Sequence, residues 1–236
     1  MRVLLMRTCL VDHVAPGIGR ATRRVLERLG VTVVEPRDQT CCGQAGWTAG
    51  HPDEARAVAR RTLRAFAGTE PVVVPSGSCT AMIVHAYPEL FAGHPEEGAA
   101  RDLAGRTLEL TQFLVAHGLA PAAARDAPAH VTHHHSCHML RLLRETESPG
   151  HVLDGAGIEH TPLPDAEVCC GFGGVFAVDF PEVSGALGEA KARSAASTDA
   201  EALVGCDLSC LVHIAGRAHR TGIDLTVRHI AEVLEG

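Results

Sequence analysis

Short apolar runs alternate with longer amphipathic stretches in the first third of the chain. Val3–Met6, Val31–Glu35 and Val72–Val74 are short and largely apolar, which predicts buried strands. Pro16–Leu29 and Pro52–Ala67 place apolar residues at intervals of three and four, the spacing of one helix face. Strand, helix, strand, helix, strand is the order of a parallel sheet covered by helices on both faces.

The second half of the chain shows the same order. Strands are predicted at His130–His134, near Ile158–His160 and at Ala202–Val204, and helices at Met139–Glu145 and near Val183–Ser197. We therefore expect an α/β protein with two pseudo-symmetric halves, each a small, mostly parallel sheet flanked by helices.

The middle of the chain supplies the expected boundary between the halves. Leu103–Ala116 is predicted to be helical, and Gly118–Pro128 has the Gly, Pro and Ala content of a linker. We expect a first domain at residues 1–120 and a second at residues 121–236, each long enough to bury a core.

The cysteines repeat more regularly than the rest of the chain. Eight of the nine fall in two sets with the spacings C-x31-CC-x36-C and C-x31-CC-x39-C. The first set is Cys9, Cys41, Cys42 and Cys79, and the second is Cys137, Cys169, Cys170 and Cys210. The first three members of the two sets are 128 positions apart and the fourth members 131, so the chain contains an internal repeat.

The cysteines follow the predicted strands closely, so each set is expected at the carboxyl edge of its sheet, where open α/β sheets bind ligands. Four thiolates in one pocket repel one another, and a metal or metal cluster neutralises them. Four sulfurs are the number that a [4Fe-4S] centre needs. Gly43 and Gly171 follow the cysteine pairs, and a permissive residue there allows the tight turn that aims both sulfurs at one centre.

Other uses of the cysteines are weighed against this interpretation. Structural zinc usually shows C-x2-4-C pairs, and Cys206 with Cys210 is the single candidate. A disulfide between adjacent cysteines and plain burial in the core also stay open. Cys206 has no counterpart in the first half, and we expect a buried or half-buried spare thiol.

Composition narrows the class of protein. The 236 residues carry a formal charge of −7, with Lys and Arg scattered along the chain, so nucleic acid is not an expected partner. No apolar run approaches the roughly 18 residues that cross a bilayer, and the N-terminus lacks the features of a signal peptide. We expect a cytoplasmic protein, in which cysteines serve as metal ligands or redox groups more often than as disulfides.

Several motifs carry a resemblance to a known family. Besides the two Cys-Cys-Gly turns, PSGSC ends at Cys79, HSCHMLR surrounds Cys137, CCGFGGVFAV starts at Cys169 and DLSCLVHIAGR surrounds Cys210. They resemble the cysteine-rich CCG domains that occur in heterodisulfide reductase, in the glycolate oxidase iron–sulfur subunit and, most of all, in the lactate utilization protein A family.

The resemblance implies a function. It implies an iron–sulfur electron-transfer subunit, with one cluster per domain held by the two cysteine sets, in a complex that oxidises L-lactate to pyruvate. The implied partners are a ferredoxin-type iron–sulfur protein and a third subunit. Alternatives are a heterodisulfide reductase-like or glycolate oxidase-like redox subunit and a zinc-binding structural protein. Because no residue stands out as a base for a 2-hydroxy acid, we expect no substrate chemistry from this chain alone.

The sequence also departs from the fuller pattern. CCG domains with five cysteines end in C-x2-C, and Ser76 and Asp207 occupy the places of the first cysteine of that pair. Each is either an oxygen ligand or a helix N-cap. Histidines surround the second set at positions 133, 134, 135, 138 and 213. We expect at least one to lie near its centre, where an N–H group would raise the reduction potential.

Overall fold

The computed structural model describes residues 1–235 and contains two parallel four-stranded sheets. The first sheet has the order β2-β1-β3-β4 and the second β6-β5-β7-β8. The strands of the first are β1 Arg2–Leu5, β2 Thr32–Val34, β3 Val72–Val74 and β4 Thr107–Glu109. Those of the second are β5 His130–His134, β6 Glu159–Pro162, β7 Ala202–Gly205 and β8 Val227–His229. The predicted α/β class and the pseudo-symmetry of the halves are confirmed.

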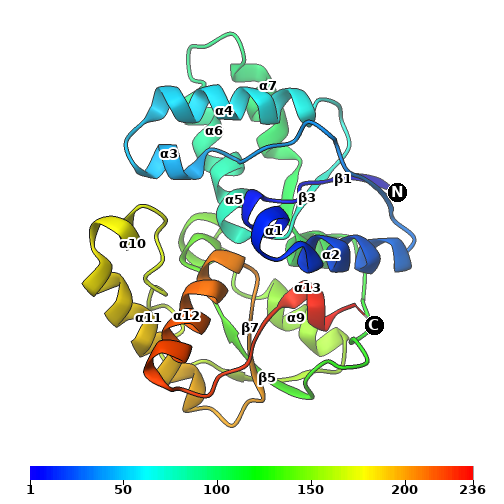
Figure 1. Ribbon diagram of the computed structural model, residues 1–236. Helices are drawn as coiled ribbons and strands as arrows, with labels where there is room; N and C mark the ends of the chain where they lie inside the picture. Colours follow the sequence, from blue (N-terminus) through cyan, green and yellow to red (C-terminus); the bar gives the residue numbers. More distant parts are fainter. Residues whose placement is uncertain (236) are drawn as a thin grey trace.

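Helices follow the strands in both halves (Figure 1). The first half holds α1 Cys9–Val14, α2 Pro16–Arg28, α3 Gln44–Thr48, α4 Pro52–Ala65, α5 Gly77–Ala81, α6 Tyr87–Leu90, α7 Glu97–Gly105 and α8 Leu110–Ala116, with the π-helix η1 Met82–Ala86. The second half holds the π-helix η2 His138–Leu143, α9 Ser148–Gly155, α10 Phe176–Asp179, α11 Pro181–Ala196, α12 Leu208–Thr221 and α13 Ile230–Val233.

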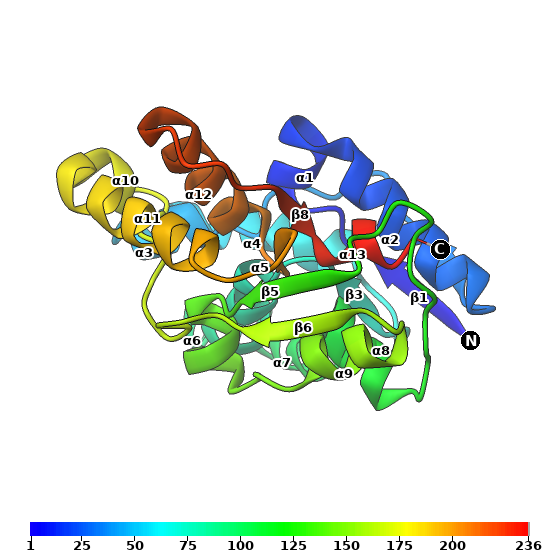
Figure 2. The same cartoon turned by 90° about the horizontal axis from the view of Figure 1, so that it is seen from below.

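Alternate residues of each central strand enter different cores. Val3 and Leu5 face a core that contains residues of both halves, among them Val131 and Val204. Leu4 faces the outer core of the first sheet, which α4, η1, α6 and α7 complete. Helices α11 and α12 cover the outer face of the second sheet (Figure 2). The shared core joins the two sheets, and within it α8 packs against α9 and α2 against α13.

Some predicted elements were wrong. The single helix predicted over Leu103–Ala116 is two helices, α7 and α8, with β4 between them. Thr107 pairs with Val72 at the sheet edge, and this tertiary pairing overrides a local helical pattern. The strand β8 was not predicted because three residues are too few to show an alternation. Residues 118–128 contain no helix or strand, as expected of the linker.

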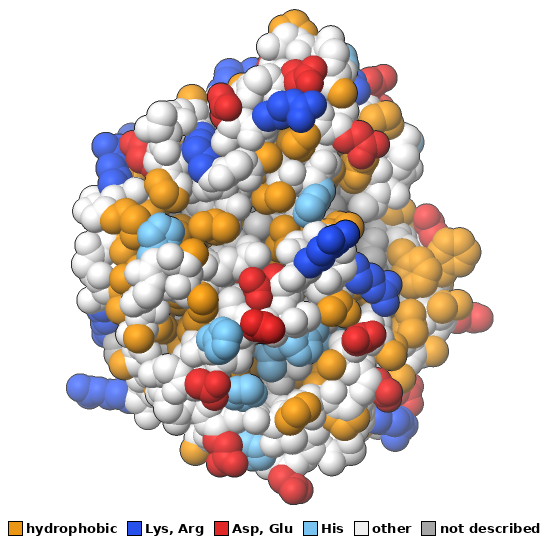
Figure 3. All heavy atoms as spheres, turned by 180° about the vertical axis from the view of Figure 1, so that it is seen from behind, with side chains coloured by type: hydrophobic (Ala, Val, Ile, Leu, Met, Phe, Trp, Pro, Cys, Tyr) orange, Lys and Arg blue, Asp and Glu red, His pale blue; other side chains and the backbone are white. Residues whose placement is uncertain are grey.

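Charged side chains of both signs are interspersed over the surface. On the face seen in Figure 3, Lys and Arg lie among Asp and Glu without a broad patch of one sign. Ion pairs such as Arg23 with Glu27 and Arg193 with Glu189 join opposite charges on the same helix. This agrees with the scattered basic residues of the sequence.

Candidate metal centre

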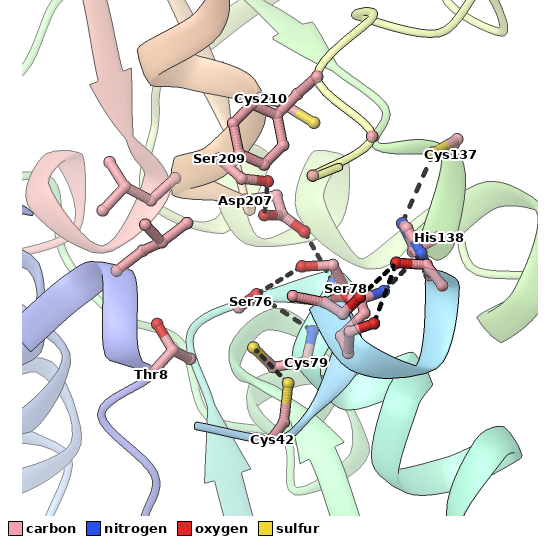
Figure 4. Close-up of a pocket in the computed structure, with 18 of the residues that line it drawn as sticks. Thr8, Cys42, Ser76, Ser78, Cys79, Cys137, His138, Asp207, Ser209 and Cys210 are labelled. Carbon is pink, nitrogen blue, oxygen red and sulfur yellow. Dashed lines mark hydrogen bonds between the residues drawn. The ribbon is translucent and has the colours of Figure 1, made fainter. Parts of the chain in front are cut away.

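The two cysteine sets line one cavity of about 250 Å³ between the halves of the molecule. Cys9 begins α1 after β1, and Cys79 lies in α5 after β3; Cys137 follows β5, and Cys210 lies in α12 after β7. All eight cysteines of the two sets contribute to the cavity wall. The carboxyl ends of both parallel sheets therefore open onto the same space, and the expected position of the cysteines is correct (Figure 4).

The sulfurs of the first set form a continuous chain of contacts. Sγ of Cys9 lies 3.6 Å from Sγ of Cys41, and Sγ of Cys42 lies 3.4 Å from Sγ of Cys79. Contact with Cys42, and then with Cys9, lowers the pKa of Cys41 well below that of a free thiol. The same contacts raise the pKa of Cys9 and of Cys42. Cys41 is thus the member of the set that loses its proton most easily, and the thiols of Cys9 and Cys42 stabilise its negative charge. A bound cation would stabilise such negative charge in place of these protons.

The second set repeats this arrangement. Cys169 contacts Cys137 and Cys170, and Cys170 contacts Cys210. Hydrogen bonding from Cys137, and then from Cys170, lowers the pKa of Cys169, while the pKa values of Cys137 and Cys170 rise. The regular cysteine spacing in the sequence therefore corresponds to two equivalent sulfur clusters.

The glycine of each Cys-Cys-Gly turn has a left-handed backbone. Gly43 and Gly171 both have a φ of +89°, a region that glycine adopts without steric cost. Their N–H groups donate to the first sulfur of the pair, at 3.4 Å for Cys41 and 3.3 Å for Cys169. The turn thus brings two adjacent sulfurs into one cluster and hydrogen-bonds one of them.

In the first half, two residues that are distant in the sequence hydrogen-bond to the backbone of the cysteine pair. The hydroxyl of Tyr87 donates to the Cys42 carbonyl at 2.8 Å, and that of Thr62 donates to the Cys41 carbonyl at 3.3 Å. No motif in the sequence marks either residue. A buried tyrosine needs a hydrogen-bond partner for its hydroxyl, but the sequence does not show which one.

Ser76 and Asp207 differ in their roles. Ser76 is the N-cap of α5, and its hydroxyl accepts a hydrogen bond from the Cys79 N–H at 3.3 Å. Asp207 holds the N-cap position of α12 but makes no side-chain bond to that helix backbone. Its carboxylate instead accepts from the Ser78 N–H of the other half and from the Ser209 hydroxyl, both at 2.7 Å. The N-cap interpretation is thus correct for Ser76, while Asp207 links the two halves.

His138 connects the second set to the first. Its Nε2 lies 2.7 Å from Nε2 of Gln44, and its Nδ1 lies 3.6 Å from Sγ of Cys137. Because the amide nitrogen of Gln44 only donates, Nε2 of His138 is the acceptor. Nδ1 of His138 then carries the hydrogen, on the side of the Cys137 sulfur. Gln44 directly follows the first Cys-Cys-Gly turn, so these two contacts connect the first half to Cys137 of the second. Figure 4 shows the contact between His138 and Cys137.

The other histidines are distributed as the alternation of a strand requires. His134 is buried beside Cys170 and Cys210. His133 lies on the opposite side of β5, where its Nε2 is 3.9 Å from Sγ of Cys206. The ring of His135 packs on that of His133. His213 bonds to the Ser184 carbonyl at 3.1 Å and does not line the cavity.

Cys206 is a buried thiol of the shared core, as the sequence predicted. Burial raises its pKa, so it stays protonated and unreactive. It contributes nothing to the cavity wall.

The donor sets fit a thiophilic metal group. Each set gathers four sulfurs, and soft thiolates select iron–sulfur clusters, zinc or copper(I). If iron–sulfur centres occupy these positions, Cys9, Cys41, Cys42 and Cys79 would hold one and Cys137, Cys169, Cys170 and Cys210 the other. The N–H groups of Gly43 and Gly171 are hydrogen-bond donors suited to such a centre.

Comparison with known proteins agrees with this geometry. The family model of the cysteine-rich CCG domain matches residues 3–84 and again residues 131–215. A lactate utilization protein A of Shouchella clausii is 45% identical over 236 residues, covering 99% of this chain and 98% of the relative. Those of Geobacillus thermodenitrificans and Bacillus pumilus are 44% and 42% identical, with coverage of 98% and 99% of their lengths. The chain belongs to the lactate utilization protein A family.

Among solved structures, a hypothetical protein from Helicobacter pylori has the same fold. It aligns with a TM-score of 0.66 and 11% identity over all of this chain. The aligned part is 49% of that chain, so this member of the lactate utilization protein A family spans about half of its structural neighbour. Within residues 1–235, none of the helices is both long and apolar enough to span a bilayer.

Proposed function

We propose that the protein is an iron–sulfur electron-transfer subunit of a complex that oxidises L-lactate to pyruvate. The observation that carries the proposal is the convergence of eight cysteines, in two equivalent sets, on one cavity. The name shared by the relatives supplies the substrate. When bound, iron–sulfur centres take up and release single electrons. Oxidation of L-lactate to pyruvate releases two electrons and two protons, so two one-electron sites match its stoichiometry.

The cavity wall supports a role without substrate chemistry. An organic carboxylate is usually held by Arg or Lys, and neither is among the cavity-lining residues of the described chain. The single carboxylate there, Asp207, already accepts two hydrogen bonds. A second subunit would therefore bind L-lactate and remove its proton. Our proposal includes a ferredoxin-type iron–sulfur protein and a third subunit as partners.

The nine free cysteines fit a reducing compartment, so our proposal includes a cytoplasmic location. In such a compartment the eight clustered thiols remain available as ligands.

A zinc-binding structural protein is a second candidate, favoured by the spacing of the sulfurs. A tetrahedral zinc ion with Zn–S bonds of about 2.3 Å holds its sulfurs about 3.8 Å apart. The contacts of 3.6 Å and 3.4 Å in the first set are close to this value.

The cavity of about 250 Å³ beside the sulfurs is many times the roughly 30 Å³ that one water occupies. A multinuclear cluster needs such space, and a single ion does not.

Metal analysis after anaerobic purification tests the proposal. We expect brown protein with several irons, a matching amount of acid-labile sulfide and an EPR signal on reduction. Colourless protein with zinc would overturn the proposal in favour of the second candidate.

Single substitutions test whether there are two sites. Cys41→Ser and Cys170→Ser should each remove about half of the iron, because each set supplies the ligands of a whole cluster. Cys206→Ala is the matched control and should retain all of it. Loss of all iron from either serine variant would mean one shared site.

A further inference from the structure

The two halves differ at one matched position beside the cysteines. Met6 and His134 are 128 positions apart, the same interval that relates the first three cysteines of the sets. Met6 follows β1 and His134 ends β5, and these strands occupy matching places in their sheets. A thioether in the first half therefore takes the place of an imidazole in the second.

Each side chain lies in the buried region that holds the two most buried cysteines of its own set. Met6 is completely buried in the apolar cluster that contains Cys42 and Cys79. His134 is 2% exposed, and one of its ring nitrogens and the sulfurs of Cys170 and Cys210 all lie within 4.8 Å of one another. The imidazole thus lies directly beside two sulfurs of the second set.

The ring of His134 lacks a partner elsewhere in the protein. Neither Nδ1 nor Nε2 has a hydrogen bond within the described chain. A buried polar group without a partner destabilises the protein, and a neutral imidazole has one N–H to donate. An acceptor held by the second set would satisfy this donor.

A buried lysine adds a second difference. Lys191 of α11 is 2% exposed, and its Nζ donates to the Asp165 carbonyl at 2.6 Å. Burial lowers the pKa of Lys191, whereas Asp165 and then Cys170 raise it. The helices α4 and α11 begin at Pro52 and Pro181, so Thr62 is the equivalent of Lys191. The first half therefore has a neutral side chain in place of this amine.

We propose that His134 donates its ring N–H to a sulfur of the iron–sulfur centre held by the second set, giving that centre a higher reduction potential than the first. The inference rests on the proposed function. Each iron of a [4Fe-4S] centre needs one protein ligand, and four cysteines already supply them, so the imidazole acts as a donor. Donors near the sulfurs stabilise the more negative, reduced centre. The positive charge of Lys191 acts in the same direction, so electrons collect at the second centre.

Exchange of the two residues tests the inference. Anaerobic redox titration followed by EPR should resolve two midpoint potentials in the wild-type protein. His134→Met should lower the higher one, with a roughly tenfold fall in the reduced-to-oxidised ratio at fixed potential, which equals a shift of about 59 mV. Met6→His should raise the lower one. Both variants should keep the wild-type iron content, because neither residue is a ligand.

Further variants separate donation from a merely structural role. His135→Met, one position along the chain, should leave both potentials unchanged. His134→Gln keeps an N–H donor and should recover part of the shift. Iron-replete His134→Met and Met6→His proteins with wild-type potentials would overturn this inference alone, and so would a directly coordinated nitrogen in pulsed EPR. An iron-free wild-type protein would instead overturn the proposed function. If His134→Met does not fold, Met6→His tests the same effect in the other half.

Discussion

The carboxylate of Asp207 accepts a hydrogen bond from the backbone N–H of Ser78, with 2.7 Å between Oδ2 and N (Figure 4). The two residues belong to different halves: Ser78 directly precedes Cys79, and Asp207 precedes Cys210 by three positions. Asp207 is 3% exposed, so water does not compete effectively for this bond. The contact fixes the position of one cluster relative to the other.

Loss of this carboxylate should destabilise the protein. Asp207→Ala leaves the Ser78 N–H and the Ser209 hydroxyl without their acceptor, and hydrogen bonds to charged groups contribute about 1.5–3 kcal/mol. We expect a lower midpoint of urea unfolding, measured by circular dichroism, when the variant and the wild-type protein have the same metal content. Asp126→Ala removes an exposed ion pair with Arg228 and should change stability by less than about 1 kcal/mol. Equal effects of the two substitutions would contradict the role of Asp207.

Gly77 allows α5 to approach the second half. A Cβ at this position would lie 2.8 Å from Sδ of Met139 and 3.0 Å from Oγ of Ser136. Gly77→Ala should therefore cost about 1–3 kcal/mol through overpacking. At Gly216, in the exposed part of α12, a Cβ would meet no other atom within 4 Å. Gly216→Ala should stabilise the protein by up to about 1 kcal/mol, and thermal unfolding distinguishes the two outcomes by sign.

The two Cys-Cys-Gly turns should differ in their tolerance of a side chain. At Gly171 a Cβ would lie 2.5 Å from the Ser184 carbonyl oxygen, and at Gly43 it would lie 3.1 Å from that of Ala55. Both positions have a positive φ, but only the first also clashes severely with backbone. We expect Gly171→Ala to lose about half of the iron, the share of the second centre, and Gly43→Ala to lose less. Iron quantification after anaerobic purification checks this prediction. A greater loss of iron from Gly43→Ala than from Gly171→Ala would contradict it.

Glu109 should make stability depend on pH. Burial raises the pKa of Glu109 from 4.5 to about 7, although hydrogen bonds from Thr111 oppose the shift. Between these values the folded protein holds a proton that the unfolded chain releases. The contribution of Glu109 to stability is therefore greatest below pH 4.5 and falls by about 3 kcal/mol as the pH rises to about 7. Glu109→Gln should flatten this profile in urea unfolding at several pH values. Glu54→Gln, at an exposed position, is the control and should leave the pH profile unchanged. If the stability of Glu109→Gln fell as steeply with rising pH as that of the wild-type protein, the assignment to Glu109 would be contradicted.

The sequence predicted the central strands and the cysteine sets because both leave local or periodic signals. Val72–Val74 is an uninterrupted apolar run, and the cysteines repeat at fixed intervals. The edge strands β4 and β8 have three residues each, and pairing with a neighbour distant in the chain determines them. The contacts of Asp207 with Ser78 and of Gln44 with His138 depend on how the halves meet, which no local pattern encodes. The sequence likewise placed histidines near the second set, but the alternation of β5 in three dimensions singled out His134.

The shared core has a consequence for the repeat unit itself. Val3, Leu5, Val131 and Val204 lie in one apolar cluster to which both halves contribute. A single copy of the repeat, produced alone, would present this surface to solvent. Such a fragment would be expected to self-associate or aggregate, and duplication within one polypeptide supplies the second copy at a fixed one-to-one ratio.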